Sequence, residues 1–217
     1  MPISSFGAAN SIIKSGVVTS TTRPASPYDG QVIYETDTDR VAVYDSSAWV
    51  YKTNAGAPAL TLIKTQTIGS GVSSVTVNDV FSSTYNNYHI SVSGGVTSTA
   101  TGMRMTLGST TTGYYSSGLY VAYNSSSVVG FNTSNGSFYP FGYAGTNVIT
   151  GATYLQNPFA SKETVFHSLI AETNTVGLTV LRNGFLNNTT SYTAFTIAPD
   201  SGTFTGGTIR VYGYANS

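Results

Sequence analysis

The chain has two histidines, nine acidic residues and no cysteine, so few of its side chains are suited to acid–base catalysis. A serine hydrolase would need His89 or His167 beside a serine nucleophile, and the Gly-x-Ser-x-Gly sequence that presents such a serine is missing. Both histidines fall in predicted strands, with His89 on a polar face. We therefore expect surface or hydrogen-bonded histidines, and we predict no catalytic residues.

The acidic residues do not form a recognisable site either. Asp37 and Asp39 have the spacing with which a calcium-binding loop begins, but the glycine and the distal glutamate of that loop are missing. Aspartate and threonine are common turn residues, so a turn is the simpler interpretation. A glycan-degrading enzyme needs two carboxylates beside a groove, and nothing in the sequence pairs the candidates, which are Asp79, Glu163, Glu172 and Asp200. We predict no metal site and no cofactor, and a glycan-degrading enzyme is the least favoured alternative.

The best candidate for a binding function is the aromatic tract at residues 109–146, where rings are interleaved with glycine, serine and asparagine. Tyrosine rings offer contact area at a low entropy cost and keep a hydroxyl group for hydrogen bonds, and sugar faces stack on such rings. The candidate glycan-binding residues are Tyr114, Tyr115, Tyr120, Tyr123, Tyr139, Phe141 and Tyr143. The alternative is that these rings fill the domain core or the axis of an oligomer.

The composition excludes several classes of function. Charged residues are only 8% of the chain and the formal net charge is zero, so binding to nucleic-acid phosphates is not expected. No apolar run is long enough for a transmembrane helix, and residues 1–18 lack the features of a signal peptide. Serine and threonine together make up 62 of 217 residues. A neutral surface of this kind has little charge repulsion to keep copies apart, which favours self-assembly.

The elements that must position these residues are predicted to be strands, because threonine and tyrosine favour strands and glycine and serine favour turns. Three short strands are expected at 31–35, 40–44 and 48–52, and they form a small meander within residues 23–53. Alternation places Val41, Val43 and Trp49 on one face. Such a meander buries too little to be stable alone, so we expect these residues to pack against another surface.

The remaining segments flank this meander. Residues 1–22 are small and weakly apolar, and we expect them to dock onto a partner. Residues 54–59 form a small-residue linker. Residues 60–217 are predicted to form one domain, an antiparallel β-sandwich of jelly-roll type with eight to ten strands. Strands are expected near 62–67, 72–77, 87–93, 101–107, 119–123, 147–155, 163–171, 176–182, 190–197 and 206–214.

Two stretches of the sequence carry a resemblance to a known group of proteins. Residues 23–40 read RPASPYDGQVIYETDTDR and are followed by Val43-Tyr44 and Ser47-Ala48-Trp49. This stretch resembles a module of structural proteins of tailed bacteriophages, particularly tail-fibre and minor tail proteins. The C-terminal β-sandwich of such fibres is similar to residues 60–217 at Phe81, Thr84-Tyr85, Tyr88, Gly113-Tyr114-Tyr115 and 206–214.

The resemblance implies a non-enzymatic virion protein. Members of the group are typically trimers, so it implies a homotrimeric fibre or fibre-like appendage, docked on another virion protein through residues 1–22. Its C-terminal domain is expected to point outward and to contact a glycan on the host cell surface. A head fibre or decoration protein attached to the capsid is the alternative, and a tail enzyme that degrades glycans is less favoured.

Overall fold

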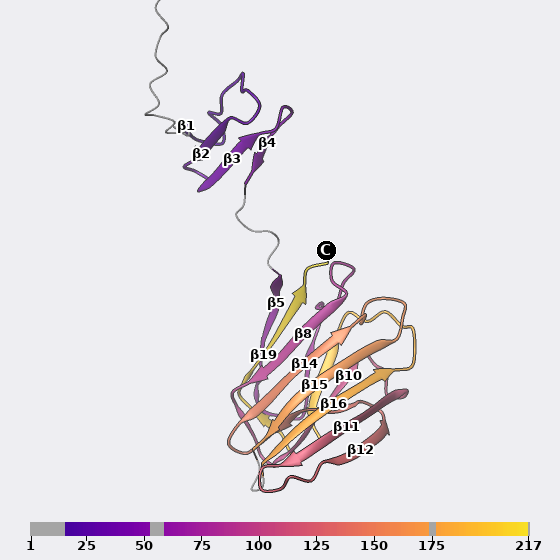
Figure 1. Ribbon diagram of the computed structural model, residues 1–217. Helices are drawn as coiled ribbons and strands as arrows, with labels where there is room; N and C mark the ends of the chain where they lie inside the picture. The colour runs from indigo at the N-terminus through magenta and orange to yellow at the C-terminus, as the bar shows by residue number, and fades with distance from the viewer. Residues whose placement is uncertain (1–15, 53–58, 174–176, 217) are drawn as a thin grey trace, which may run out of the picture. The chain divides into compact units, whose positions relative to one another are not determined.

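The protein is all-β. The computed structural model describes residues 16–52, 59–173 and 177–216, and these divide into two compact units, one up to Lys52 and the other from Ala59 onward. The described residues contain no helix, and so none that is long and apolar enough to cross a membrane. The predicted fold class, a small N-terminal meander followed by a larger antiparallel β-structure, is confirmed (Figure 1). Of the predicted N-terminal segment and linker, residues 1–15 and 54–58 lie outside the described residues.

The small unit is one four-stranded sheet in the order β1-β2-β3-β4. Its strands are β1 (Gly16–Val18), β2 (Val32–Glu35), β3 (Arg40–Tyr44) and β4 (Trp49–Tyr51). Strands β2 to β4 form the predicted meander, because the turns at 36–39 and 45–48 are rich in aspartate, serine and threonine. Strand β1 was not predicted, and it adds to the sheet parallel to β2.

The faces of this sheet differ from the prediction at one position. Val41 and Val43 share a face, as alternation requires, but Trp49 pairs with Tyr44 and lies on the opposite face. Val50, which pairs with Val43, takes the place predicted for Trp49. The error arose because the turn after β3 shifts the alternation of β4 by one residue, and a shift of one residue reverses the face of every side chain in a strand.

The large unit contains the remaining strands. They are β5 (Leu60–Thr67), β6 (Ser70–Val72), β7 (Val75–Val77), β8 (Asn87–Ser93), β9 (Val96–Thr97), β10 (Thr101–Leu107), β11 (Tyr114–Ala122), β12 (Val129–Asn135), β13 (Phe138–Ala144), β14 (Ile149–Gln156), β15 (Thr164–Glu172), β16 (Leu178–Leu186), β17 (Phe195–Pro199), β18 (Phe204–Thr205) and β19 (Thr208–Tyr214). Twelve of them form one antiparallel sheet, and β6, β18 and β9 form a small separate one.

The large sheet folds into two layers. The wide layer has the order β5-β19-β8-β14-β15-β16-β11-β12 (Figure 1). The narrow layer has the order β13-β10-β17-β7. The layers are joined because the first half of β14 pairs with β13 while its second half pairs with β15. The two layers of this sandwich are therefore connected by backbone hydrogen bonds instead of forming two separate sheets.

The core lies between the two layers. Phe138 on β13 lies against Phe166 on β15 with ring centroids 4.2 Å apart, and Tyr114 on β11 meets Phe138 edge-on at 4.8 Å. Fully buried residues of the wide layer include Ile90 and Ile209. Because side chains alternate along each strand, the same strands must also present a row of side chains on the face that points away from the narrow layer. We call this the outer face.

The aromatic tract at residues 109–146 proves to be regular structure. It forms β11, β12 and β13, of which only the end of β11 was predicted as a strand. Its glycine, serine and asparagine residues weaken the local strand signal, but β11 pairs with β16 along nine residues, from Tyr114 to Ala122. This pairing is between strands far apart in the sequence, so no local pattern could reveal it.

Candidate functional site

Two rows of side chains cross the outer face of the wide layer, and we call them, together with Tyr214, the binding face. Cross-strand pairing sets one row in the order Asn87, Gln156, Val165, Phe185, Tyr115 and Ser134. It sets the second row in the order Tyr212, His89, Tyr154, His167, Asn183, Ser117 and Asn132. The second row crosses seven strands, so at about 4.8 Å per strand it is roughly 30 Å long.

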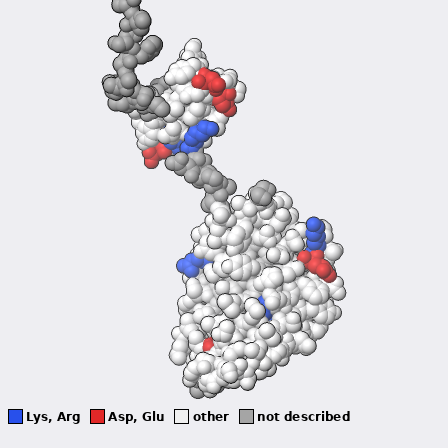
Figure 2. All heavy atoms as spheres, viewed as in Figure 1, with Lys and Arg blue, Asp and Glu red and all other residues white. Residues whose placement is uncertain are grey.

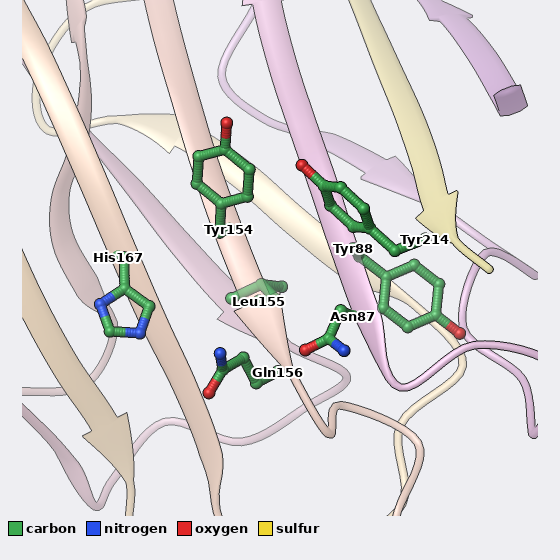
Figure 3. A pocket seen from close by; sticks show the side chains of 7 residues that line it. All are labelled: Asn87, Tyr88, Tyr154, Leu155, Gln156, His167 and Tyr214. Carbon is green, nitrogen blue, oxygen red and sulfur yellow. The ribbon is translucent and has the colours of Figure 1, made fainter. Parts of the chain in front are cut away.

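A groove of about 450 Å³ lies at one end of the binding face, and Asn87, Tyr154, Gln156, His167 and Tyr214 contribute to its lining (Figure 3). Tyr88 and Leu155 also line it, but both side chains belong to the core. The ring of Tyr214 is tilted toward that of Tyr154, and the two ring centroids lie 6.2 Å apart. Tyr154 is 45% exposed, so one surface of its ring is open to a ligand.

The hydroxyl group of Tyr214 in the groove stays neutral at physiological pH. Burial raises the pKa of Tyr214 above its ordinary value, and its hydrogen bond with Tyr154 raises it further. Asn87 and Gln156, which are paired across β8 and β14 and exposed, place two amide groups beside these rings. Each amide group offers N–H donors and a carbonyl acceptor. The groove therefore presents uncharged hydrogen-bond donors and acceptors next to aromatic surface.

His167 is held in one orientation by its neighbour. Its Nδ1 atom lies 2.7 Å from Oδ1 of Asn183 on β16. Because a carbonyl oxygen only accepts hydrogen bonds, Nδ1 carries a proton and donates it, and in the neutral ring the other nitrogen, Nε2, is an acceptor. The histidine thus adds a hydrogen-bond acceptor at the edge of the groove.

The binding face continues beyond His167 with further hollows. Tyr115 and Phe185 stack with ring centroids 5.4 Å apart and line a hollow of about 350 Å³ together with Ser117, Asn132 and Asn183. Glu163 lines a neighbouring hollow at the margin of the face. An aliphatic row formed by Leu119, Leu181 and Leu169 borders the face on its other side.

The binding face carries no charged side chain in its two rows, and Figure 2 shows the corresponding view of the large unit as almost entirely uncharged. Aromatic rings and amide groups in alternation suit a ligand with apolar ring faces and many hydroxyl groups. They do not suit a phosphate or another strongly anionic ligand, which needs arginine or lysine. In the described part of the chain no group of three or more histidine or acidic residues could hold a metal ion.

The residues predicted from the sequence as glycan contacts are distributed over both layers of the sandwich. Tyr114, Phe141 and Tyr143 are 1%, 0% and 3% exposed and pack in the core, which leaves no ring surface for a ligand. Tyr120 packs against Phe131. Tyr139 packs beside Arg104 on the narrow layer, with Cζ of the arginine 5.5 Å from the ring centroid.

Two of the predicted residues are exposed. Tyr115 belongs to the binding face, and Tyr123 is 80% exposed next to the end of β11. The residues that line the groove were not predicted as contacts, because they come from β8, β14, β15 and β19, which lie outside the aromatic tract at residues 109–146. Alternation on β8 did place His89 on a polar face, and the same rule applied to β14 would have selected Tyr154 and Gln156 as outward residues.

His89 lies between Tyr154 and Tyr212, with ring centroids 4.8 and 6.0 Å away, and its Nδ1 atom has no hydrogen-bond partner among the described residues. Burial lowers the pKa of His89 below its ordinary value. The unfolded chain therefore takes up a proton at this residue at a higher pH than the folded protein does. We expect the free energy of unfolding to fall as the pH drops from above about 6.5 toward the lower folded-state pKa.

This pH dependence is checked by denaturant unfolding of the wild type and a His89→Gln variant between pH 8 and pH 5. The variant should lose less stability over this range, because it lacks the titrating ring. Parallel curves for the two proteins would show that His89 does not cause the pH dependence.

Comparisons of the chain with protein-family models, with curated proteins and with solved structures find no match.

Proposed function

We propose that this chain is a non-enzymatic structural protein of a bacteriophage virion, a fibre-like appendage whose large unit binds an uncharged glycan on the host cell. The observation that carries the glycan contact is the binding face, in which the exposed ring of Tyr154 lies beside the amide groups of Asn87 and Gln156 without a charged neighbour in either row. The resemblance of residues 23–49 to phage fibre modules supports the virion role.

The shape of the binding face suits a chain of sugars better than a single small molecule. It is long and shallow, with one groove and further hollows along the same rows. Shallow aromatic sites bury little area, so binding per copy is weak, and several copies on one particle raise the overall affinity through effective concentration. The proposed homotrimer would supply three such faces, and residues 1–22 would anchor it on another virion protein.

Catalysis is not part of this proposal. A glycosidase needs two carboxyl groups on either side of the scissile bond, and none of the residues lining the groove at Tyr154 is acidic. Glu163 lines a hollow at the margin of the binding face, and the other residues that line this hollow are not acidic.

An array of neutral and acidic bacterial polysaccharides tests the proposal. The purified chain should bind neutral polysaccharides and release no reducing ends from them. Tyr154→Ala should weaken the binding about tenfold, since one stacking contact is worth about 1.4 kcal/mol. The matched control is Tyr123→Ala, which removes a more exposed ring outside the binding face. Binding to acidic polysaccharides alone, or equal losses in the two variants, would overturn the proposed glycan contact.

A further inference from the structure

The binding face has a second place, away from the groove, where aromatic surface and amide groups come together. Tyr115 and Phe185, whose rings stack, are 42% and 37% exposed. Asn132 and Asn183 line the same hollow of about 350 Å³ and add their amide groups to it. This hollow, which we call the distal hollow, therefore has the chemistry of a second sugar subsite.

The groove and the distal hollow are separated by a whole number of strands. Tyr154 lies on β14 and Tyr115 on β11, and the strands between them in the sheet are β15 and β16. Three spacings of about 4.8 Å place β14 and β11 roughly 14 Å apart. One sugar unit of an extended glycan is about 5 Å long, which is close to the spacing of neighbouring strands. A glycan that crosses the sheet from Tyr154 to Tyr115 therefore has one sugar unit over each strand from β14 to β11.

The two middle strands supply hydrogen-bonding groups between the aromatic ends. His167 on β15 lines the groove, and Asn183 on β16 lines the distal hollow. The hydrogen bond between them, which is 2.7 Å long, uses Nδ1 of His167 and Oδ1 of Asn183. It leaves Nε2 of the neutral histidine ring as an acceptor and the Nδ2 group of Asn183 as a donor. Sugar hydroxyl groups both donate and accept, so they match this pair.

The arrangement of rings at the groove gives the glycan its direction. On the other side of β14 lies β8, where the ring of His89 is 4.8 Å from that of Tyr154 and 6.0 Å from that of Tyr212. His89 therefore occupies the space beside Tyr154 on that side. The hollows lie in the opposite direction, over β15, β16 and β11, so a bound chain runs from the groove toward β11.

We propose that the binding face recognises four consecutive sugar units of an extended neutral glycan, stacked on Tyr154 at one end and on Tyr115 and Phe185 at the other. This inference rests on the proposed function and adds to it a second subsite and the length of the recognised segment. The described residues that line the groove and the hollows of PKT-free surface between β14 and β11 include no lysine or arginine. Glu163 at the margin is acidic, and its charge disfavours an acidic sugar beside it.

Fragments of the neutral polysaccharide selected on the array, with two to six sugar units, test the length of the segment. In calorimetric titration of the full chain, affinity should rise up to the tetrasaccharide. The tetrasaccharide should bind about tenfold or more tightly than the disaccharide, because it gains a second stacking contact. Longer fragments should add only the small statistical gain of several binding registers.

Variants of the distal hollow test where the far end of the segment lies. Phe185→Ala and Tyr115→Ala should each weaken tetrasaccharide binding about tenfold. Both should leave the affinity for the disaccharide unchanged, because the larger groove holds the disaccharide. Tyr154→Ala should weaken the binding of both fragments, and Tyr123→Ala, which removes an exposed ring outside the binding face, should affect neither.

The outcomes separate this inference from the proposed function. Affinity that levels off before the tetrasaccharide, or that climbs steeply beyond it, would overturn the four-unit segment. Tetrasaccharide binding that Phe185→Ala and Tyr115→Ala both leave unchanged would overturn the second subsite. In these cases the proposed function stands if Tyr154→Ala still weakens binding of the polysaccharide. A chain that binds no neutral polysaccharide on the array would overturn the proposed function and this inference with it.

Discussion

An Arg182→Ala variant is expected to lose about 2–5 kcal/mol of its free energy of unfolding, because alanine leaves a large gap in the core. Arg182 is fully buried on β16, where its side chain crosses Gly118 and lies over the ring of Phe131, with Cζ 4.2 Å from the ring centroid. Its Nη2 atom donates to Oγ1 of Thr133 at 2.6 Å and to the backbone oxygen of Tyr139. The side chain thereby connects β16, β12 and β13.

An Arg182→Met variant is the informative partner of the alanine variant. Burial lowers the pKa of Arg182 to about 10, so the guanidinium is still charged at neutral pH. Its Nε and Nη1 atoms have no hydrogen-bond partner in the part of the chain that the structure describes. Methionine fills a similar space over Phe131 and removes these unpaired donors, and replacing a buried charge by an apolar side chain is often neutral or stabilising.

The loss in Arg182→Met is therefore expected to stay below about 2 kcal/mol, which is the order of the hydrogen bonds given up. Denaturant unfolding monitored by circular dichroism measures both variants. If both variants lose the same free energy of unfolding, the hydrogen bonds to Thr133 and Tyr139 carry the stabilisation. The methionine side chain, which fills the space, would then contribute nothing.

A Gly95→Ala variant is expected to lose about 3 kcal/mol or more. Gly95 has a φ of +72°, a conformation that costs an alanine about 1–2 kcal/mol. An added Cβ would also lie 2.1 Å from the backbone oxygen of Gly206. Gly94-Gly95 and Gly206-Gly207 face each other where β8 ends and its partner β19 begins. Relieving this overlap therefore moves backbone and costs about 1–3 kcal/mol more.

Gly71→Ala is the matched control, because Gly71 has a similar φ of +67° and no atom within 4 Å of an added Cβ. It should lose only the conformational cost of about 1–2 kcal/mol. Calorimetry of the full chain measures the difference as a lower melting temperature for Gly95→Ala. If both variants melt at the same temperature, β8 and β19 tolerate the extra methyl group and the close approach of the two turns is not needed.

The parts of the fold that the sequence predicted are those with local signals. The strands of the meander were predicted because Asp- and Ser-rich turns interrupt short alternating runs. Strands β12 and β13 were not, because their order in the sheet follows from pairing with distant strands. Arg182 shows the same limit, since a charged residue in a strand is expected to point outward. It points inward because it continues the alternation of Val180 and Leu186.

For the candidate site, the sequence predicted the type of side chain but not which residues would lie together. Uncharged aromatic residues were expected to carry binding, and Tyr115 is one of them. The inward residues Tyr114, Phe141 and Tyr143 could not be told from outward ones, because their faces are set by the register with β16, β10 and β14. The groove at Tyr154 joins strands separated by up to about half of the chain, and the sequence alone does not give the order of those strands.

A crystal structure of the chain with a neutral oligosaccharide selected on the array tests the proposed function most directly. We predict that the sugars lie along the binding face, with one ring against Tyr154 or Tyr214 and hydroxyl groups on Asn87 and Gln156. Sugars bound elsewhere, for example beside Tyr123 or on the narrow layer near Tyr139, with the groove free of ligand, would contradict the assignment of this face.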